Sequence, residues 1–382
     1  YNEGIKAFGG IPMKEKDSFF RAVCSLAIPV ALQSMLQSSF SIVDQIMIGQ
    51  LGSVIVAGVG LAGKFAGIYN VVVAAFGAVA GIMISQYLGQ KNRGEVKRSY
   101  YLNLVFALTF AGVFTFGCML FPKKIMGLYT TDMQTQEAAA RYLLILSGTF
   151  LPMAGATLLA TLFRCTEKAC YPLYASVCAA LANTVLNYIL IFGKLGFAPM
   201  GMEGAAIATV ISQVLNFLLM LILYGIHRRD FPLVCNGRIQ KVPFHWKQYG
   251  AILLPMLICE FIWSLGENVY AAVYGHLGTD ACAAMTLTNP IQGLTIGALC
   301  GLSQAAAVIV GKLLGDNQQK QAYQASKKLM LYGFVGAAIL SAVIVMTSGL
   351  YVNIYQVEES VKQITRRILY AYALVVPFKI QN

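Results

Sequence analysis

The chain has 382 residues, of which 58% are hydrophobic and only 12% are charged, and its mean hydropathy is +0.66. A soluble domain usually carries about 25% charged residues, so the composition excludes an ordinary soluble protein and indicates a large surface in contact with lipid. The net charge of +12 would suit a nucleic-acid partner, but the basic residues lie between apolar stretches, as in membrane proteins, and we expect no nucleic acid among the partners.

The predicted elements, in chain order, are a short lead-in and ten apolar segments. Residues 1–20 have no long apolar core, so we interpret them as a cytoplasmic lead-in and not as a cleaved signal. A membrane-spanning helix needs about 20 mostly apolar residues, and the segments that reach or approach this length are 23–48, 54–84, 100–121, 137–163, 171–192, 205–226, 249–274, 281–311, 328–350 and 364 to the chain end. The predicted fold is an all-α polytopic membrane protein.

The distribution of Lys and Arg predicts how these helices are oriented. With the N-terminus in the cytoplasm, most basic residues between the helices fall on the cytoplasmic side, including those in residues 228–247. Because cytoplasmic loops carry an excess of Lys and Arg, we expect a cytoplasmic N-terminus. We also expect a multi-pass position in the plasma (inner) membrane, with the lipid bilayer around a monomer.

The chain repeats itself with a shift of 226 residues. Pro29 then corresponds to Pro255, and Leu88-Gly89 to Leu314-Gly315, without a gap. Repeats are typical of transporters, and units of six helices all start on the same side of the membrane, which makes this repeat parallel. We predict a first lobe at residues 21–227, a linker at 228–247 and a second lobe at 248–382. The second lobe is incomplete, since a full unit would hold about two more helices.

Polar residues form a stripe on the first predicted helix. Gln33, Gln37, Ser41 and Asp44 are spaced by four, four and three residues, so they lie along one face. A charge inside a membrane costs about 2.5–3.5 kcal/mol on insertion scales, which favours a face that lines an aqueous cavity and a titratable Asp44. The alternative is that Asp44 lies at the membrane interface.

The seventh and second predicted helices also carry ionisable residues. Glu260 and Glu267 are seven residues apart and share one face of the seventh helix, so we predict that they line the same cavity, with a structural hydrogen bond as the alternative. Lys64 lies near mid-depth in the second helix, where it could pair with a carboxylate or extend toward the interface. The sequence does not choose between these roles.

Uncharged candidates lie on other helices. Asn183 and Asn187 are four residues apart on the fifth helix, and Thr209 lies on the sixth; hydrogen bonding between helices is the alternative interpretation for all three. Pro29 and Pro255 lie early in the first and seventh helices, where a missing backbone hydrogen bond permits bending. A helix-packing role is as good an interpretation of these prolines as a hinge.

No motif in the sequence indicates a catalytic or metal centre. The nine Cys and three His are scattered, and neither C-x-x-C, H-E-x-x-H nor G-x-S-x-G occurs. We therefore expect no enzyme, no metal site and no cofactor other than a coupling ion. An intramembrane enzyme is a remote alternative, and a channel would not need a long tandem repeat with buried acids.

Several motifs together resemble the MATE (multidrug and toxic compound extrusion) family. They are Ile28-Pro29, Val43-Asp44-Gln45, Ser85-Gln86-Tyr87-Leu88-Gly89, Phe163-Arg164, Asn183 with Leu186-Asn187-Tyr188, and Gly204 through Thr209. The resemblance covers the chain from about residue 20 and implies twelve helices in two six-helix lobes. Asp44 and Asn183 match the DinF-like branch more than the NorM-like branch, although Asn187 stands where the DinF-like branch commonly has a second Asp.

The resemblance implies secondary active export of small organic, often cationic, molecules in exchange for H+ or Na+, and of the two ions we favour H+. Under this hypothesis, the residues that couple transport to the ion are Asp44, Glu267, Glu260, Asn183 and Asn187. The substrate cavity then includes Gln33, Gln37, Ser41, Lys64 and Thr209. The nearest alternative is a lipid-linked oligosaccharide flippase of the same superfamily, whose cavity is often cationic, whereas here only Lys64 is basic.

Overall fold

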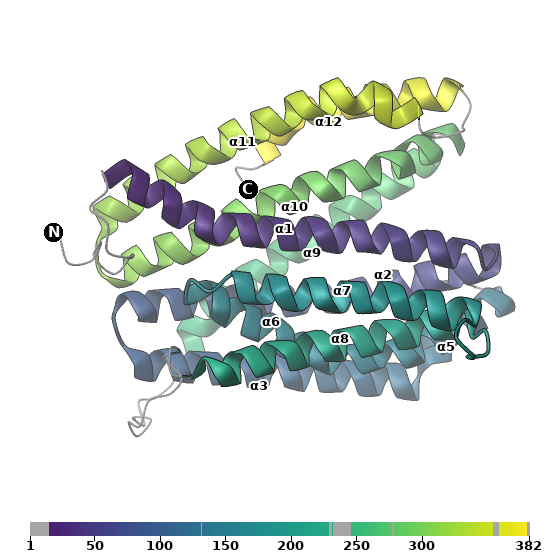
Figure 1. Cartoon of the computed structure of the whole chain (residues 1–382), viewed down its shortest axis with the longest axis horizontal. Helices are drawn as coiled ribbons and strands as arrows, with labels where there is room; N and C mark the ends of the chain where they lie inside the picture. Colours follow the sequence, from purple (N-terminus) through teal and green to yellow (C-terminus); the bar gives the residue numbers. More distant parts are fainter. Residues whose placement is uncertain are drawn as a thin grey trace.

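The computed structural model describes residues 15–130, 132–228, 231, 246–276, 279–353 and 359–379, and all regular structure in these ranges is helical. Figure 1 shows long helices that run nearly side by side. Their bounds are α1 Glu15–Gly49, α2 Ser53–Gly89, α3 Arg93–Leu120, α4 Pro122–Gly127, α5 Met133–Leu146, η1 Ser147–Thr149, α6 Phe150–Cys165, α7 Cys170–Phe192, α8 Gly201–Ile226, α9 Trp246–His276, α10 Thr279–Gly315, α11 Gln319–Asn353 and α12 Glu359–Lys379.

Each of the ten apolar segments coincides with helix in the structure. In the described ranges, eight helical stretches are long and apolar enough to cross a membrane; α9 has a shorter apolar part, Tyr249–Trp263, and α12 is not among them. The prediction of an all-helical, multi-pass membrane protein is confirmed. The short helix α4, which follows α3 at the Phe121–Pro122 turn, was not predicted.

The fourth predicted helix differs from the expectation because it is interrupted. The segment 137–163 is divided among α5, the 3₁₀ turn η1 and α6. Hydroxyl groups bind carbonyls around the turn: Ser147 Oγ donates to Leu144 O (2.6 Å), and Tyr69 Oη donates to Phe150 O (2.5 Å). Such side-chain bonds compete with the regular helical pattern, and they hold the bend against α2.

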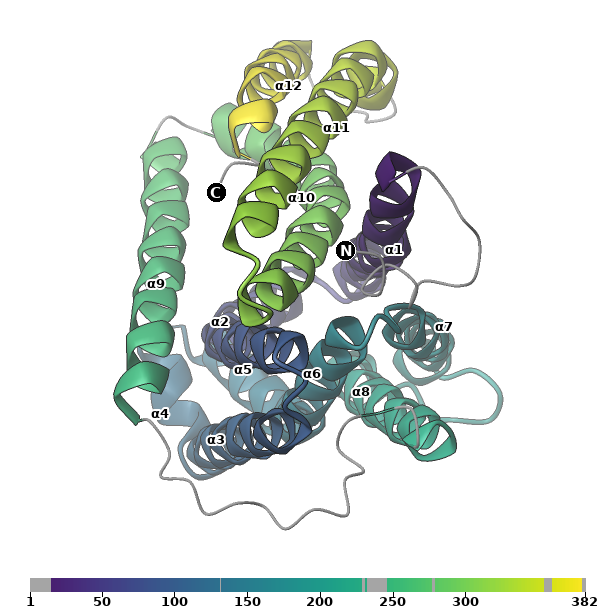
Figure 2. The ribbon, with the colours of Figure 1, turned by 90° about the vertical axis from the view of Figure 1, so that its left-hand side faces the viewer.

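The helices form two groups, and the larger apolar core also includes Ala305 and Val308 of α10. The amino-terminal group, α1–α8, is centred on Tyr69, whose ring lies 4.4 Å from that of Phe150 and 5.4 Å from that of Phe114. The carboxy-terminal group is α9–α12, and α10, α11 and α12 share a second core around Leu369. Figure 2 shows the two groups from one end of the bundle. The lobe boundaries at 227 and 248 stay a prediction, and most of the linker lies outside the described residues.

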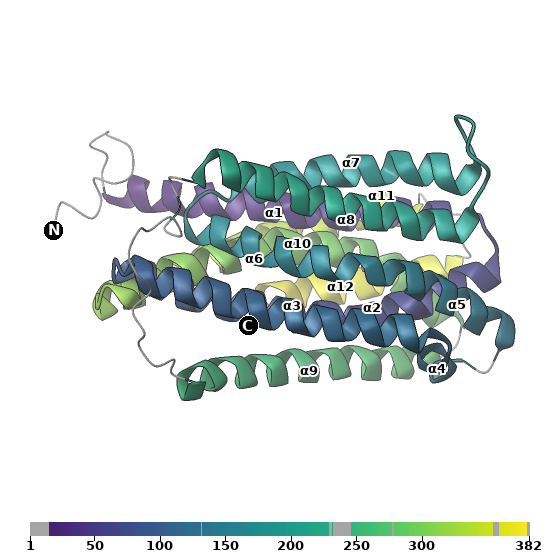
Figure 3. The ribbon, with the colours of Figure 1, turned by 90° about the horizontal axis from the view of Figure 1, so that it is seen from below.

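The two ends of the bundle differ in which helices meet there. The proximal end is where α1 begins and where α2 meets α3, α6 meets α7 and α10 meets α11; the distal end is where α1 meets α2 and α7 meets α8. Figure 3 shows α9 along the side of the amino-terminal group, with which it makes contact through α2.

The two groups touch closely toward the proximal end. Tyr249 of α9 donates a hydrogen bond to Asn103 Oδ1 of α3 (3.1 Å), and Lys312 of α10 forms an ion pair with Glu167 between α6 and α7. A Cβ added to Gly89 of α2 would lie 2.9 Å from the Lys312 carbonyl carbon. The backbones of α2 and α10 are therefore in direct contact at this end.

Toward the distal end, α2 has an open sector. A Cβ added to Gly60, Gly63 or Gly67 would have no heavy atom within 4 Å, and Lys64 between them is exposed. The opposite side of the same stretch, including Ala62 and Tyr69, is fully buried in the amino-terminal group. The helix thus has one buried side and one open side over its distal half.

Candidate functional site

The candidate site lies inside the amino-terminal group, where α1 and α7 run in parallel. Asn187 of α7 donates from Nδ2 to Asp44 Oδ1 of α1 (2.7 Å), and Gln33 Nε2 of α1 donates to Ser176 Oγ of α7 (2.8 Å). Both pairs are separated by 143 residues in the chain, so the two helices keep one register over three turns. The Asp44 carboxylate thus faces α7.

Asn183 is a second amide neighbour of Asp44, and its side-chain amide can form hydrogen bonds in two orientations. With its nitrogen toward Asp44, it donates to both carboxylate oxygens, at 2.9 and 3.1 Å. With its oxygen toward Asp44, its nitrogen donates to Ser212 Oγ of α8 (3.3 Å), and Asn187 donates to its oxygen (3.2 Å). The first orientation suits an ionised carboxylate and the second a protonated one, which would itself donate to the amide oxygen.

Tyr142 of α5 and Thr209 of α8 complete the surroundings. Tyr142 is buried, interacts with Thr209 and lies within electrostatic range of Asp44. Thr209 Oγ1 donates to Ala205 O of its own helix (2.9 Å). The site therefore draws on four helices, and its side chains apart from Asp44 are uncharged.

The Asp44 carboxylate has no basic partner in the described part of the chain. The ion pairs found there join other residues, and no group of three or more His, Cys, Asp or Glu is gathered anywhere among them. An unpaired charge inside a membrane protein is strongly unfavourable. Two amides can donate hydrogen bonds to the carboxylate, but they cannot neutralise it, so the site suits an exchangeable cation or proton.

A groove lies at the distal end beside this site. Its volume is about 580 Å³, and it is lined by Val43, Ile46, Met47, Gln50, Tyr188, Phe192 and Lys194. Val43 precedes Asp44 in α1, and Tyr188 follows Asn187 in α7. The groove therefore lies next to the carboxylate along both helices, and Asp44 itself is not among its lining residues.

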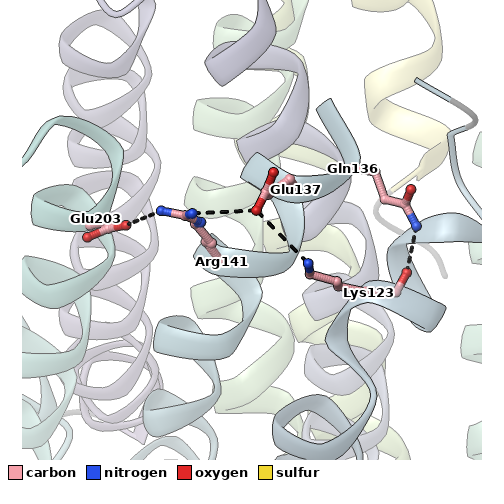
Figure 4. A network of polar contacts seen from close by, with 5 residues as sticks. All are labelled: Lys123, Gln136, Glu137, Arg141 and Glu203. Atoms are coloured by element: carbon pink, nitrogen blue, oxygen red, sulfur yellow. Dashed lines mark hydrogen bonds and ion pairs between the residues drawn. The ribbon is translucent and has the colours of Figure 1, made fainter. Parts of the chain in front are cut away.

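A network of charged residues fixes α5 against α8 near the distal end (Figure 4). Arg141 lies 3.4 Å from Glu137 and 3.6 Å from Glu203 of α8, and Lys123 of α4 lies 4.0 Å from Glu137. Gln136 Nε2 donates to the Lys123 carbonyl (2.9 Å). These side chains are exposed, so each ion pair contributes only about 0–1 kcal/mol. The network joins α5 to α4 and α8 at this end of the bundle.

Two of the residues predicted to line a central cavity lie elsewhere. Asp44 faces α7 within the amino-terminal group and not the space between the two groups, and Gln33 is buried in the α1–α7 contact. The reason is that the polar stripe on α1 finds hydrogen-bond partners on the neighbouring helix. Gln37 and Ser41, the other two residues of the stripe, are exposed, and their place in a substrate cavity stays a prediction.

The structure does not place the predicted acids of the seventh helix, Glu260 and Glu267, at this site within the part of the chain that it describes. Glu260 is half-buried on α9, and the side chain of Glu267 lies outside what the structure describes. Pro29 and Pro255 lie inside α1 and α9, which continue through them. Their role as hinges stays a prediction.

Sequence reasoning missed Ser176, Ser212 and Tyr142. A signal for Ser176 was present: Gln33 and Asp44 are 11 residues apart, as are Ser176 and Asn187. Equal spacing of polar residues on two helices is what parallel packing with one register requires. Tyr142 carried no comparable signal, because its place depends on the bend at η1.

Comparisons with known proteins give a consistent result. The profile of the MatE family matches residues 29–189 and 255–382. A relative named "Probable multidrug resistance protein NorM" from Thermotoga maritima is 25% identical over 309 residues, covering 80% of this chain and 65% of that protein. "Probable multidrug resistance protein YoeA" from Bacillus subtilis is 24% identical over 364 residues, covering 93% of this chain and 78% of that protein. The chain thus spans just under two thirds of the first relative's length.

Solved structures share the fold. The crystal structure of a MATE in complex with MaL6 has a TM-score of 0.85 at 19% identity, and the match covers 100% of this chain and 84% of the other. An outward-facing multidrug resistance MATE family transporter of the MOP superfamily has a TM-score of 0.83, also at 19% identity, with 97% and 83% covered. The likeness extends over the whole chain, including the helices beyond residue 227.

Proposed function

This chain belongs to the MatE family, and we propose that it is a secondary active transporter that exports small organic molecules in exchange for protons. The observation that supports this most directly is the unpaired Asp44 carboxylate, held by the amides of Asn187 and Asn183. A carboxylate with neutral partners can take up and release a cation without breaking an internal ion pair. A proton fits the site better than Na+, because a second carboxylate is not among the neighbours described.

The proposed orientation places the proximal end in the cytoplasm, because most Lys and Arg between the helices lie there. The close contact of α2 with α10 and the Lys312–Glu167 pair would then close the cytoplasmic side. Protons would reach Asp44 from the distal side, because Asp44 lies five residues before the distal end of α1. Alternating access would follow when the two helix groups separate at the proximal end and approach each other at the distal end.

Protonation of Asp44 would change its contacts with α7. The ionised carboxylate accepts hydrogen bonds from both amides, whereas the protonated group donates one bond and allows Asn183 to turn toward Ser212. The number of hydrogen bonds that hold α1 to α7 therefore depends on whether Asp44 is protonated. A cargo with a positive group would compete with the proton for the same charge, which couples uptake of one to release of the other.

The test is proton-driven transport by purified protein in liposomes. Asp44→Asn keeps the size and a hydrogen-bonding group but cannot exchange a proton, so we expect transport driven by a pH gradient to fall at least tenfold. Gln33→Leu is the matched control, because it removes a hydrogen bond between the same two helices without touching a charge. We expect it to retain pH-driven transport. The same measurement with a Na+ gradient alone should give no transport.

A folded Asp44→Asn protein with wild-type pH-driven rates would contradict the proposal. So would equal losses in Asp44→Asn and Gln33→Leu, because the effect would then reflect helix contact and not proton exchange. Transport driven by Na+ in the absence of a pH gradient would show that the coupling ion is Na+.

A further inference from the structure

Lys64 is a cation inside a membrane-spanning helix, α2, and none of the carboxylates that the structure describes pairs with it. Its side chain is exposed, and among the residues that the structure describes it forms no ion pair or hydrogen bond. It lies 11 residues after the distal start of α2, or about 16 Å along the helix at 1.5 Å per residue. Lysines that extend their charge to the membrane surface lie near helix ends, whereas Lys64 lies about three turns inside α2.

The side of α2 that carries Lys64 faces the other helix group. Gly89, on whose backbone α10 packs, lies 25 residues after Lys64, which is close to seven turns at 3.6 residues per turn. The two residues therefore project from the same side of the helix. Near the proximal end this side is in contact with α10. Near Lys64 it is open, because a Cβ added to Gly60, Gly63 or Gly67 would have no heavy atom within 4 Å.

Two uncharged polar residues lie at the same depth on the neighbouring helices. Gln37 lies 12 residues before the distal end of α1, and Asn289 lies 10 residues after the distal start of α10; both are exposed. These positions correspond to depths of about 18 and 15 Å, close to that of Lys64. The helical period places Gln37 between the side of α1 that contacts α7 and the side that contacts α10. Asn289 lies one turn distal to Gly293, which faces Ser38 of α1.

We propose that Lys64, with Gln37 and Asn289 beside it, forms a carboxylate-binding subsite between the two helix groups, so that the preferred cargo is a zwitterionic amphiphile and not a simple organic cation. This inference rests on the proposed transport function and narrows its substrate class. The ammonium group of Lys64 and the amide nitrogens of Gln37 and Asn289 are hydrogen-bond donors suited to a carboxylate.

The charges of the molecule favour this class of cargo. A cargo with only a positive charge would meet like charge at Lys64 on its way into the open space. A cargo with both charges can bind Lys64 through its carboxylate, and this attraction offsets the repulsion between Lys64 and the ammonium group of the cargo. Glycines around Lys64 leave room for an apolar body next to the α2 backbone.

The test uses two fluorescent probes that differ by one carboxylate. Nε-dansyl-lysine carries an ammonium and a carboxylate group, whereas dansylcadaverine has the same chain and ammonium group without the carboxylate. Equilibrium binding to the purified full chain in detergent is followed by dansyl emission. We expect wild-type protein to bind Nε-dansyl-lysine about tenfold more tightly, a difference of about 1.4 kcal/mol.

Substitutions of Lys64 should abolish or retain this preference according to charge. In Lys64→Met both probes should bind equally, with dansylcadaverine bound at least as tightly as by wild type, which also reports correct folding. Lys64→Arg should retain the preference. The control Lys320→Met removes a positive charge from the exposed start of α11 and should behave as wild type.

Three results would overturn the proposal: a wild-type protein that binds both probes equally, one that does not bind Nε-dansyl-lysine, or a preference that persists in Lys64→Met. Because binding is measured without an ion gradient, this outcome is independent of proton coupling. Loss of transport in Asp44→Asn with an intact probe preference supports both proposals. A probe preference without any pH-driven transport would leave the subsite standing and reject the proposed function.

Discussion

The contact between α2 and α10 at the proximal end offers the sharpest test of how the two helix groups move. The perturbation is Gly89→Ala, which adds one methyl group at the last residue of α2. That methyl would lie 2.9 Å from the carbonyl carbon of Lys312 and 3.0 Å from the amide nitrogen of Asp316, and closer still to the Lys312 oxygen. These are backbone atoms, so a change of rotamer cannot relieve the clash.

The size of the effect follows from these distances. Non-bonded heavy atoms prefer separations of about 3.5–4.0 Å, so α10 would have to move away by about 1 Å or more. Overpacking of this kind costs about 1–3 kcal/mol, and only the state in which α2 and α10 touch carries this cost. The ratio of closed to open proximal ends should therefore fall about 5- to 150-fold.

Gly60→Ala is the matched control for this substitution. Gly60 lies on the same helix, and a Cβ there would have no heavy atom within 4 Å. Both substitutions improve helix propensity, by up to about 1 kcal/mol, so their difference isolates the contact with α10. We expect Gly60→Ala to leave the conformational equilibrium unchanged.

The assay is a distance measurement between spin labels at Arg93 and Lys320, in a variant without native cysteines. Both positions are exposed at the proximal end, one on each helix group. Wild type and Gly60→Ala should share one main distance, and Gly89→Ala should add a longer one. An unchanged distance distribution in a folded, monodisperse Gly89→Ala protein would refute the reasoning, because α10 would then not rest on Gly89.

Two further predictions concern charged residues. Glu167→Gln and Lys312→Met should each open the proximal end slightly, because a partly exposed ion pair contributes about 0–1 kcal/mol. The double variant should open it no further than either single variant. The distance between the spin labels at Arg93 and Lys320 measures the opening, and additive effects of the two substitutions would contradict the Lys312–Glu167 pairing. Asp132 caps α5 by accepting hydrogen bonds from Thr135 N (3.0 Å) and Oγ1 (2.5 Å), and these bonds lower the pKa of Asp132 below its usual value. The stabilisation by ionised Asp132 should therefore be complete above the usual Asp pKa of about 3.9 and disappear as the pH falls through the lower folded-state value. Hydrogen exchange of the Thr135 amide should accelerate in Asp132→Ala at neutral pH, less so in Asp132→Asn, and the gap between wild type and Asp132→Asn should close in acid.

The helical architecture could be predicted from the sequence because hydropathy acts locally. A stretch of about 20 apolar residues has few alternatives to a membrane-spanning helix, and all ten predicted segments are helical. The interruption at η1 could not be predicted in this way. It depends on hydrogen bonds from Tyr69 and Thr115, which lie 81 and 32 residues away from their acceptors.

The candidate site could be predicted in part. The spacing of Gln33 and Asp44 identified one polar face of α1, but it left open whether that face meets water or another helix. The answer lies in the pairing with α7, which brings Asn187 to Asp44 over 143 residues. The direction of a polar face becomes predictable only when the partner helix and its register are known.

One helix connects the proposed proton site to the contact between the two groups. The side of α1 that carries Gln33 and Asp44 is bound to α7, and the adjoining side, with Ser34, packs on α10 at Gly297. A Cβ added to Gly297 would lie 3.1 Å from the backbone of α1, so α1 cannot turn or shift on α7 without disturbing its contact with α10. Under the proposed function, a proton that alters how tightly Asp44 holds α7 would act on the junction of the two groups through α1 itself, without a separate relay through the core.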